Sequence, residues 1–206
     1  MLLFDLQFSM PAGKWNQAIW EGTGDWLHSL WMNGHLLSQV PWSRETSGKT
    51  LHAVVSVPCH AALDEDLMGS WPKRELARVR ALGTKGPRKH LLAGDESGFL
   101  LTWKRAPSLY LYTGATERDP HVVRSATRGT AIPTFLLPIP DESKQYLSSW
   151  ASNVQKTDSI WLSASGALEG ACYRELADPA SSLNEIGEGH RAEIEAATGK
   201  PTYLHL

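Results

Sequence analysis

Hydrophobic and polar residues alternate in two short stretches of the N-terminal half of the chain. In the first, Leu2, Phe4, Leu6 and Phe8 fall on one face, and in the second the residues at 51–57 are rich in β-branched side chains and alternate. Successive side chains of a strand point to opposite faces, so both stretches predict half-buried strands.

Apolar residues recur at helical spacing elsewhere in this half. Residues 15–30 predict a helix, which the glycines at 22 and 24 are expected to split or kink. Residues 70–82 predict a second helix. Residues 83–87 are expected to form a loop, and residues 90–92 a short strand.

The last third of the chain has mainly helical patterns. Three helices are expected, over residues 141–156, 166–176 and 182–198, before a terminal strand at 202–206. The third should begin at the capping box Ser182-x-x-Glu185. Its inward face is expected to carry Leu183, Ile186, His190, Ile194 and Ala197, and the first helix has Tyr146, Leu147, Trp150 and Val154 on one stripe.

The mixture of strands and helices lacks the regular alternation of βαβ units, which favours an α+β fold. We expect a mixed or antiparallel sheet packed with several helices and a helical C-terminal third. Residues 1–206 are interpreted as a single α+β domain, with sub-units 1–94 and 95–206 as the possible division.

Composition narrows the setting in which the chain works. No stretch is apolar over the roughly 20 residues that span a bilayer, and the N-terminus lacks the basic region of a secretory signal. The two cysteines, Cys59 and Cys172, are isolated, which suits a reducing compartment. We therefore expect a cytoplasmic protein with no membrane partner.

The net charge of −2 conceals a segregation along the sequence. Residues 1–70 carry −4, residues 71–140 carry +7 and residues 141–206 carry −5. A basic middle segment could attract phosphate, or the complementary segments could neutralise one another within the fold. The nine tryptophans likewise have two interpretations, a core of large aromatics or exposed anchors of a protein interface.

The candidate catalytic motifs each lack an element. His52, Cys59 and His60 are the nearest approach to a reactive cluster, but a fourth metal donor at suitable spacing is missing, and neighbours on a strand point apart. Residues 94–98 lack the glycine spacing of a nucleophile elbow, and residues 83–86 lack that of a phosphate loop. We expect no catalytic residue, no bound metal and no cofactor.

Acidic residues supply the one predicted contact site. Asp64, Glu65 and Asp66 form a triplet that could bind a basic partner, or could simply face water. His190 lies on the apolar stripe of its helix and is expected to be a buried, hydrogen-bonded histidine.

Five segments together resemble a bacterial family of unknown function described as zinc-ribbon-containing, for which nucleic-acid binding has been suggested. The segments are 30–37 (LWMNGHLL), 107–113 (PSLYLYT), 146–150 (YLSSW), 174–183 (RELADPASSL) and 195–204 (EAATGKPTYL). The resemblance implies a zinc ribbon with cysteines near positions 101, 103, 124 and 127, because four thiolates complete a tetrahedral zinc site. This chain has Leu101, Trp103, Arg124 and Thr127 at those positions, so the implied ribbon is degenerate and without metal.

These observations lead to a prediction with two alternatives. The prediction is a non-catalytic, cytoplasmic protein-binding module, most concretely an immunity protein that neutralises a bacterial toxin, such as a nuclease effector, by direct contact. The first alternative is a nucleic-acid-binding protein with a degenerate zinc ribbon, whose basic residues should share one face with exposed aromatic residues. The second alternative is an enzyme whose site the sequence does not reveal.

Overall fold

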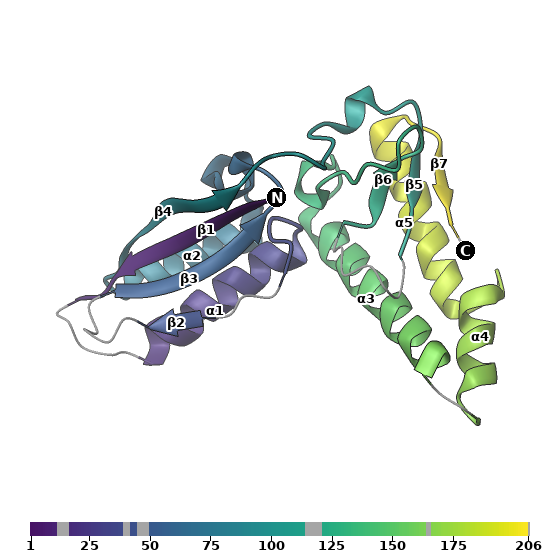
Figure 1. Ribbon diagram of the computed structural model, residues 1–206, viewed down its shortest axis with the longest axis horizontal. Helices are drawn as coiled ribbons and strands as arrows, with labels where there is room; N and C mark the ends of the chain where they lie inside the picture. The colour runs from purple at the N-terminus through teal and green to yellow at the C-terminus, as the bar shows by residue number, and fades with distance from the viewer. Residues whose placement is uncertain (12–16, 39–41, 45–49, 114–120, 164–165, 206) are drawn as a thin grey trace. The chain divides into compact units, whose positions relative to one another are not determined.

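The chain forms two compact units, Met1–Gly98 and Phe99–Leu206, in a computed structural model (Figure 1). The structure describes residues 1–11, 17–38, 42–44, 50–113, 121–163 and 166–205, with the backbone alone at 42–44. The sequence favoured one domain with a possible division after residue 94. In the structure the chain divides into its two units after residue 98. The predicted α+β class is confirmed, and so is the helical character of the last third.

The first unit contains a four-stranded antiparallel sheet and two helices. Its main elements in chain order are β1 (Leu2–Ser9), α1 (Gln17–Met32), β2 (Trp42–Arg44), β3 (Thr50–Val57), α2 (Ser70–Ala81) and β4 (Lys85–Gly94). The strands are ordered β2-β3-β1-β4. This βαββαβ sequence with β1 between β3 and β4 is the split βαβ arrangement of the ferredoxin-like fold.

One face of this sheet is apolar and is covered by both helices, as the alternation of β1 predicts. Phe4 and Phe8 are buried, and the ring of Phe8 meets that of Trp26 from α1 edge-on, with centroids 5.5 Å apart. The opposite face is polar. On that face the Nδ1 of His52 in β3 lies 2.9 Å from a carboxylate oxygen of Asp5 in β1.

The structure corrects two expectations for the first unit. Helix α1 runs without interruption from Gln17 to Met32. Gly22 is buried, and a Cβ there would lie 3.3 Å from Val79 of α2, so the glycine serves close helix packing. Strand β4 begins at Lys85, within the predicted loop at 83–87, and extends well beyond the strand predicted at 90–92, because it pairs with β1 along most of its length.

The second unit contains a small mixed sheet and a group of helices, of which two pack against the sheet. The main elements are β5 (Leu109–Leu111), β6 (Val123–Ser125), α3 (Asp141–Ser163), α4 (Glu169–Ala177), α5 (Ser182–Thr198) and β7 (Thr202–Leu204). Strand β5 lies between β6, which is antiparallel to it, and β7, which is parallel to it. The core joins the inward residues of this sheet, among them Leu109 and Leu111, to Leu147 and Trp150 of α3 and Ile194 of α5.

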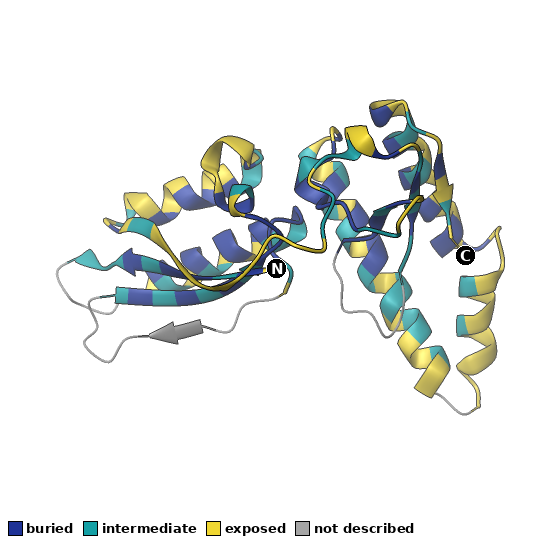
Figure 2. Cartoon of the chain, turned by 45° about the horizontal axis from the view of Figure 1, so that its top comes forward, coloured by how far each residue is buried: buried dark blue, intermediate teal, exposed yellow. Residues whose placement is uncertain are grey.

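Helix α4 contributes no buried residue, and the C-terminal end of α3 beside it is also largely exposed (Figure 2).

The turn between α4 and α5 is held by several hydrogen bonds. The side-chain amide of Asn184 donates to the carbonyls of Glu175, Leu176 and Asp178, at 3.4, 3.1 and 2.8 Å. These bonds satisfy C-terminal carbonyls of α4 and fix the start of α5.

The cap of α5 lies one residue before the predicted one. The hydroxyl of Ser181 accepts from the backbone N–H of Asn184, and Ser182 is already helical, so the prediction of a Ser182 cap is wrong. The predicted end is confirmed, because Gly199 has a φ of 66° and closes the helix in the left-handed conformation.

Candidate functional site

The predicted acidic triplet is bonded to basic residues of its own unit. The guanidinium of Arg80 donates to both carboxylate oxygens of Glu65, at 2.5 and 2.9 Å, and the Nζ of Lys89 lies 3.4 Å from Asp64. The hydrogen bond from Arg80 lowers the pKa of Glu65. A basic partner would have to displace these contacts, which weakens the case for Asp64, Glu65 and Asp66 as a docking site.

Other basic residues of the middle segment also pair within the first unit. Arg78 lies 3.5 Å from Asp25 of α1 and 3.7 Å from Glu75, and Arg74 lies 3.2 Å from Glu75. For this part of the chain, complementary charges thus neutralise one another within the fold, which is one of the two interpretations that the sequence left open.

The structure does not bring His52, Cys59 and His60 together as a reactive site. His52 pairs with Asp5, and the Nδ1 of His60 lies 2.8 Å from Glu96. Cys59 is 2% exposed, and burial raises the pKa of its thiol, which opposes formation of a thiolate nucleophile. Within the described residues, no three His, Cys, Asp or Glu side chains are placed to hold a metal ion.

The four positions implied for zinc ligands have other contacts. Trp103 packs partly against the core of the second unit, whereas Leu101 is 40% exposed. The guanidinium of Arg124 lies 5.4 Å above the ring of Tyr112. Thr127 lies in the turn that follows β6. Leucine, tryptophan and arginine side chains offer no zinc donor.

The second unit has an apolar concave surface between α3 and α5, hereafter the α3–α5 groove. Its volume is about 370 Å³. From α3, residues spaced by three or four positions share one helix face and form one wall, and α5 supplies the other wall in the same way. The lining residues are Tyr146, Ser149, Trp150, Asn153, Leu183, Ile186 and His190.

The floor of the groove is built around Trp150, which is 5% exposed. Its indole N–H donates to the carbonyl of Leu183 at 2.8 Å and so joins α3 to the first turn of α5. A Cβ at Gly187 would lie 2.8 Å from the indole carbon Cζ2. Only glycine at this position lets the indole pack so closely against α5.

His190 is the titratable imidazole of the groove lining, and it is buried as the sequence predicts. Burial lowers its pKa, while the carboxylate of Glu193 and a hydrogen bond to the Tyr146 backbone act in the opposite direction. Its Nε2 is buried with no hydrogen-bond partner among the described residues. The lowered pKa favours a neutral imidazole, which suits an apolar groove.

The side chains of Tyr146 and Ile186 lie at the rim of the groove. Tyr146 is 60% exposed and Ile186 is 53% exposed. The prediction that Ile186 faces inward is therefore wrong, as is that for Ala197, which is also exposed. Carboxylates lie at one end: the hydroxyl of Tyr146 donates to Glu142 at 3.0 Å, and that of Ser143 donates to Glu193 at 2.5 Å. The groove therefore has an apolar centre and an acidic end.

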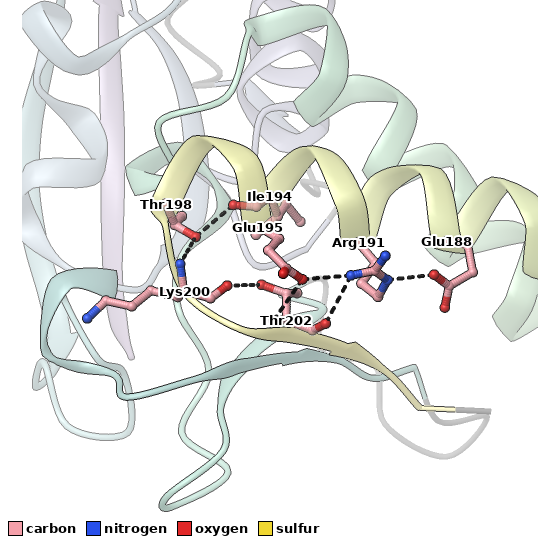
Figure 3. Close-up of polar contacts among 7 residues, drawn as sticks. All are labelled: Glu188, Arg191, Ile194, Glu195, Thr198, Lys200 and Thr202. Atoms are coloured by element: carbon pink, nitrogen blue, oxygen red, sulfur yellow. Dashed lines mark hydrogen bonds and ion pairs between the residues drawn. The ribbon is translucent and has the colours of Figure 1, made fainter.

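The opposite side of α5 holds the edge strand β7 through a polar network (Figure 3). Arg191 donates to Glu188 at 2.5 Å, to Glu195 at 2.7 Å and to the carbonyl of Thr202 at 3.3 Å. The N–H of Thr202 in turn donates to Glu195 at 3.3 Å. A hollow of about 480 Å³ adjoins this network. Because its polar groups are paired with one another, we interpret the network as support for β7.

The outer face of the small sheet gathers aromatic and basic side chains. Tyr110 of β5 is the register partner of Arg124 in β6 and of Tyr203 in β7, and partners in register lie on the same face. The ring of Tyr112 lies 6.4 Å from that of Tyr110 and 5.3 Å from that of His205. We call these five residues the tyrosine face.

The C-terminal half of the chain matches a family model described as a domain of unknown function, DUF2310, over residues 104–206. The match covers half of the chain, so the chain belongs to this family. It coincides closely with the second unit and includes both the α3–α5 groove and the tyrosine face. No curated protein and no solved structure matches the chain.

Among the described helices, none combines the length and the apolar character needed to cross a bilayer.

No tryptophan is exposed among the seven whose burial the structure describes. Where burial is described, two are buried (Trp26 and Trp150) and five are half-buried (Trp20, Trp31, Trp71, Trp103 and Trp161). The exposed aromatic residues are instead tyrosines, among them Tyr146, Tyr173 and Tyr203.

Sequence reasoning missed the groove although it identified most of its residues. Tyr146 and Trp150 were placed on one stripe, and Leu183, Ile186 and His190 on another. The missing information was the lateral offset between the two helices, which leaves the rim residues outside the shared core. The only local signal was Gly187, a glycine at an interior helix position, where it normally costs stability.

Proposed function

We propose that this protein is a non-catalytic protein-binding module and that the α3–α5 groove is its docking site. The observation that carries the proposal is an apolar groove with two exposed rim residues, Tyr146 and Ile186, above a rigidly held Trp150. Protein interfaces are centred on aromatic and aliphatic anchors that enter well-packed apolar sites.

Exposed apolar side chains also occur on the helices away from the groove. Ile160 and Leu162 near the end of α3, and Leu168 and Tyr173 near or in α4, are between 41% and 63% exposed. Because they do not line the α3–α5 groove, Leu162 and Tyr173 serve as controls for it. We keep the toxin-neutralising immunity role as the narrower form of the proposal, since an immunity protein needs only a surface complementary to its toxin.

Affinity purification from cell lysate tests the proposal. Ile186→Glu places a charge on the rim of the groove, and Leu162→Glu places the same charge on an equally exposed residue outside it. We expect Ile186→Glu to lose the protein partner and Leu162→Glu to keep it. Retention of the partner by Ile186→Glu would refute the groove as the docking site.

The immunity role has its own test. Co-expression of this protein with the product of a neighbouring toxin gene should protect cells, and Ile186→Glu should abolish that protection. Survival that is independent of Ile186, or no survival at all, would contradict the narrower proposal.

A second candidate function, nucleic-acid binding, is favoured by the tyrosine face. Bases stack on aromatic rings with roughly 1–3 kcal/mol for each stacked base, and arginine adds cation–π and phosphate contacts. Tyr203 is 59% exposed, whereas Tyr110 and Tyr112 are half-buried, so Tyr203 is the most accessible tyrosine of this face. Arg74, Arg78 and Arg80 of the first unit are paired with carboxylates of that unit.

Fluorescence anisotropy with labelled single-stranded DNA tests this second function. If it is correct, the protein binds at low salt, added salt weakens binding steeply, and Tyr203→Ala weakens it by roughly 1–3 kcal/mol. Tyr173→Ala removes an equally exposed tyrosine from α4 and serves as the control. No measurable binding at low salt would eliminate the second function.

A further inference from the structure

The α3–α5 groove has helical walls of a defined length. Its lining residues run from Tyr146 to Asn153 on α3 and from Leu183 to His190 on α5. Seven residues of helix rise about 10 Å, so the groove can hold about two turns of a third helix. A helix docked in this way contributes apolar side chains at i, i+3 or i+4, and i+7.

The alternative of an added β-strand is less suited to this unit. The backbone groups of the groove walls are hydrogen-bonded within α3 and α5 and cannot pair with a strand. At the edge strand β7, the N–H and carbonyl of Thr202 are already bonded to Glu195 and Arg191. A partner strand would have to break this network before it could extend the sheet.

Charge distinguishes the two ends of the groove. Glu142 and Glu193 lie at the end near Tyr146, each accepting a hydrogen bond from a hydroxyl. The nearby Lys144 is buried, and its Nζ faces Asp141 at 3.6 Å and the carbonyl of Phe135 at 3.4 Å. Lys144 is therefore directed to other partners, and the end of the groove remains acidic.

We infer that the occupant of the α3–α5 groove is an amphipathic helix of the protein partner, with an apolar stripe that fills the groove and a Lys or Arg at the end that meets Glu142 and Glu193. The inference rests on the proposed function and specifies the partner's chemistry. Complementary charge at one end fixes the direction in which the partner helix lies. A helix docked in the reverse direction would place its Lys or Arg far from Glu142 and Glu193.

Selection from a phage-displayed library of helix-forming peptides against the full chain tests the inference. Binders that also recognise Ile186→Glu are removed. We expect enriched peptides to carry apolar residues at i, i+3 or i+4, and i+7, with a basic residue about one turn beyond. Enrichment of acidic, proline-containing or extended sequences, or of none, would overturn the inference.

The charge element has a separate measurement on the most enriched peptide. The double variant Glu142→Gln and Glu193→Gln keeps both hydrogen-bond acceptors and removes both charges. At low salt it should bind the peptide roughly three- to tenfold more weakly, since each exposed ion pair contributes modestly. Glu169→Gln, an exposed carboxylate on α4, should leave the affinity unchanged. Equal weakening by both changes, or by neither, would contradict the charged end.

Failure of this inference can be told apart from failure of the proposed function. If the lysate partner still depends on Ile186 while the selected peptides lack the expected pattern, the groove binds protein but not a basic amphipathic helix. If Ile186→Glu keeps the lysate partner, the proposed function itself fails. A dimer of this chain that Ile186→Glu dissociates would assign the groove to a second copy and overturn the inference.

Discussion

Gly187 provides the sharpest test of how the groove is built. A Cβ at this position would lie 2.8 Å from Cζ2 of Trp150, 3.1 Å from its Cε2 and 3.1 Å from Cδ2 of Leu204. Separations below 3.0 Å are not tolerated, so Gly187→Ala must displace the indole or α5. The indole is held by its hydrogen bond to Leu183, which leaves it little room to yield.

The expected magnitude follows from opposing terms. Alanine in a helix interior gains about 1 kcal/mol over glycine. Overpacking costs about 1–3 kcal/mol, and loss of the indole hydrogen bond about 1 kcal/mol more. We therefore expect Gly187→Ala to lower the free energy of unfolding by about 1–3 kcal/mol.

Gly189 on the same helix is a matched control. A Cβ there meets no atom within 4 Å, so Gly189→Ala should gain stability by about 0.5–1 kcal/mol from helix propensity alone. Urea unfolding followed by tryptophan fluorescence measures both variants. If Gly187→Ala is as stabilising as Gly189→Ala, the close packing of Trp150 on α5 is wrong.

Three further predictions address the titrating groups, the acidic triplet and the zinc positions. Burial lowers the pKa of His121 in the second unit to about 3. The contribution of this buried, neutral imidazole to stability is complete above about pH 6.5 and is lost as the pH falls towards 3. Acid unfolding of His121→Asn should show a shallower pH dependence over this range, and an unchanged profile would contradict the lowered pKa of His121. Glu65→Gln removes the exposed ion pair with Arg80 and should cost at most about 1 kcal/mol in urea unfolding, with no loss of the protein partner; loss of the partner would restore the acidic triplet as the docking site. Elemental analysis of the purified protein should find zinc far below one atom per chain, and a stoichiometric amount would refute the degenerate ribbon.

The sequence predicted those elements in which one periodicity dominates. The alternation of residues 2–8 and 51–57 corresponds to β1 and β3, and the apolar spacing of the last third corresponds to α3, α4 and α5. These patterns arise because one face of each element is buried, and such burial can be recognised from the local sequence alone. The glycines of α1 misled because their cost in the helix is offset by packing against α2, which the local pattern does not contain.

The candidate site was predictable in its residues but not in its form. The segments YLSSW and RELADPASSL include Trp150 and the start of α5, which the structure joins through the hydrogen bond from the indole to Leu183. Asn184 then ties the start of α5 to the end of α4. Whether Tyr146 and Ile186 lie in the core or on the rim depends on how α3 and α5 are offset. The pairing of Glu65 with Arg80 was likewise undetectable, because it joins segments that only the fold brings together.

Photo-cross-linking in cells tests the central claim most directly. A benzoylphenylalanine placed at position 146, on the rim of the groove, should form an adduct with a protein partner, whereas the same residue at position 173 on α4 should not. An adduct at 173 but not at 146, or cross-linking at 146 to nucleic acid alone, would contradict a groove that serves protein recognition.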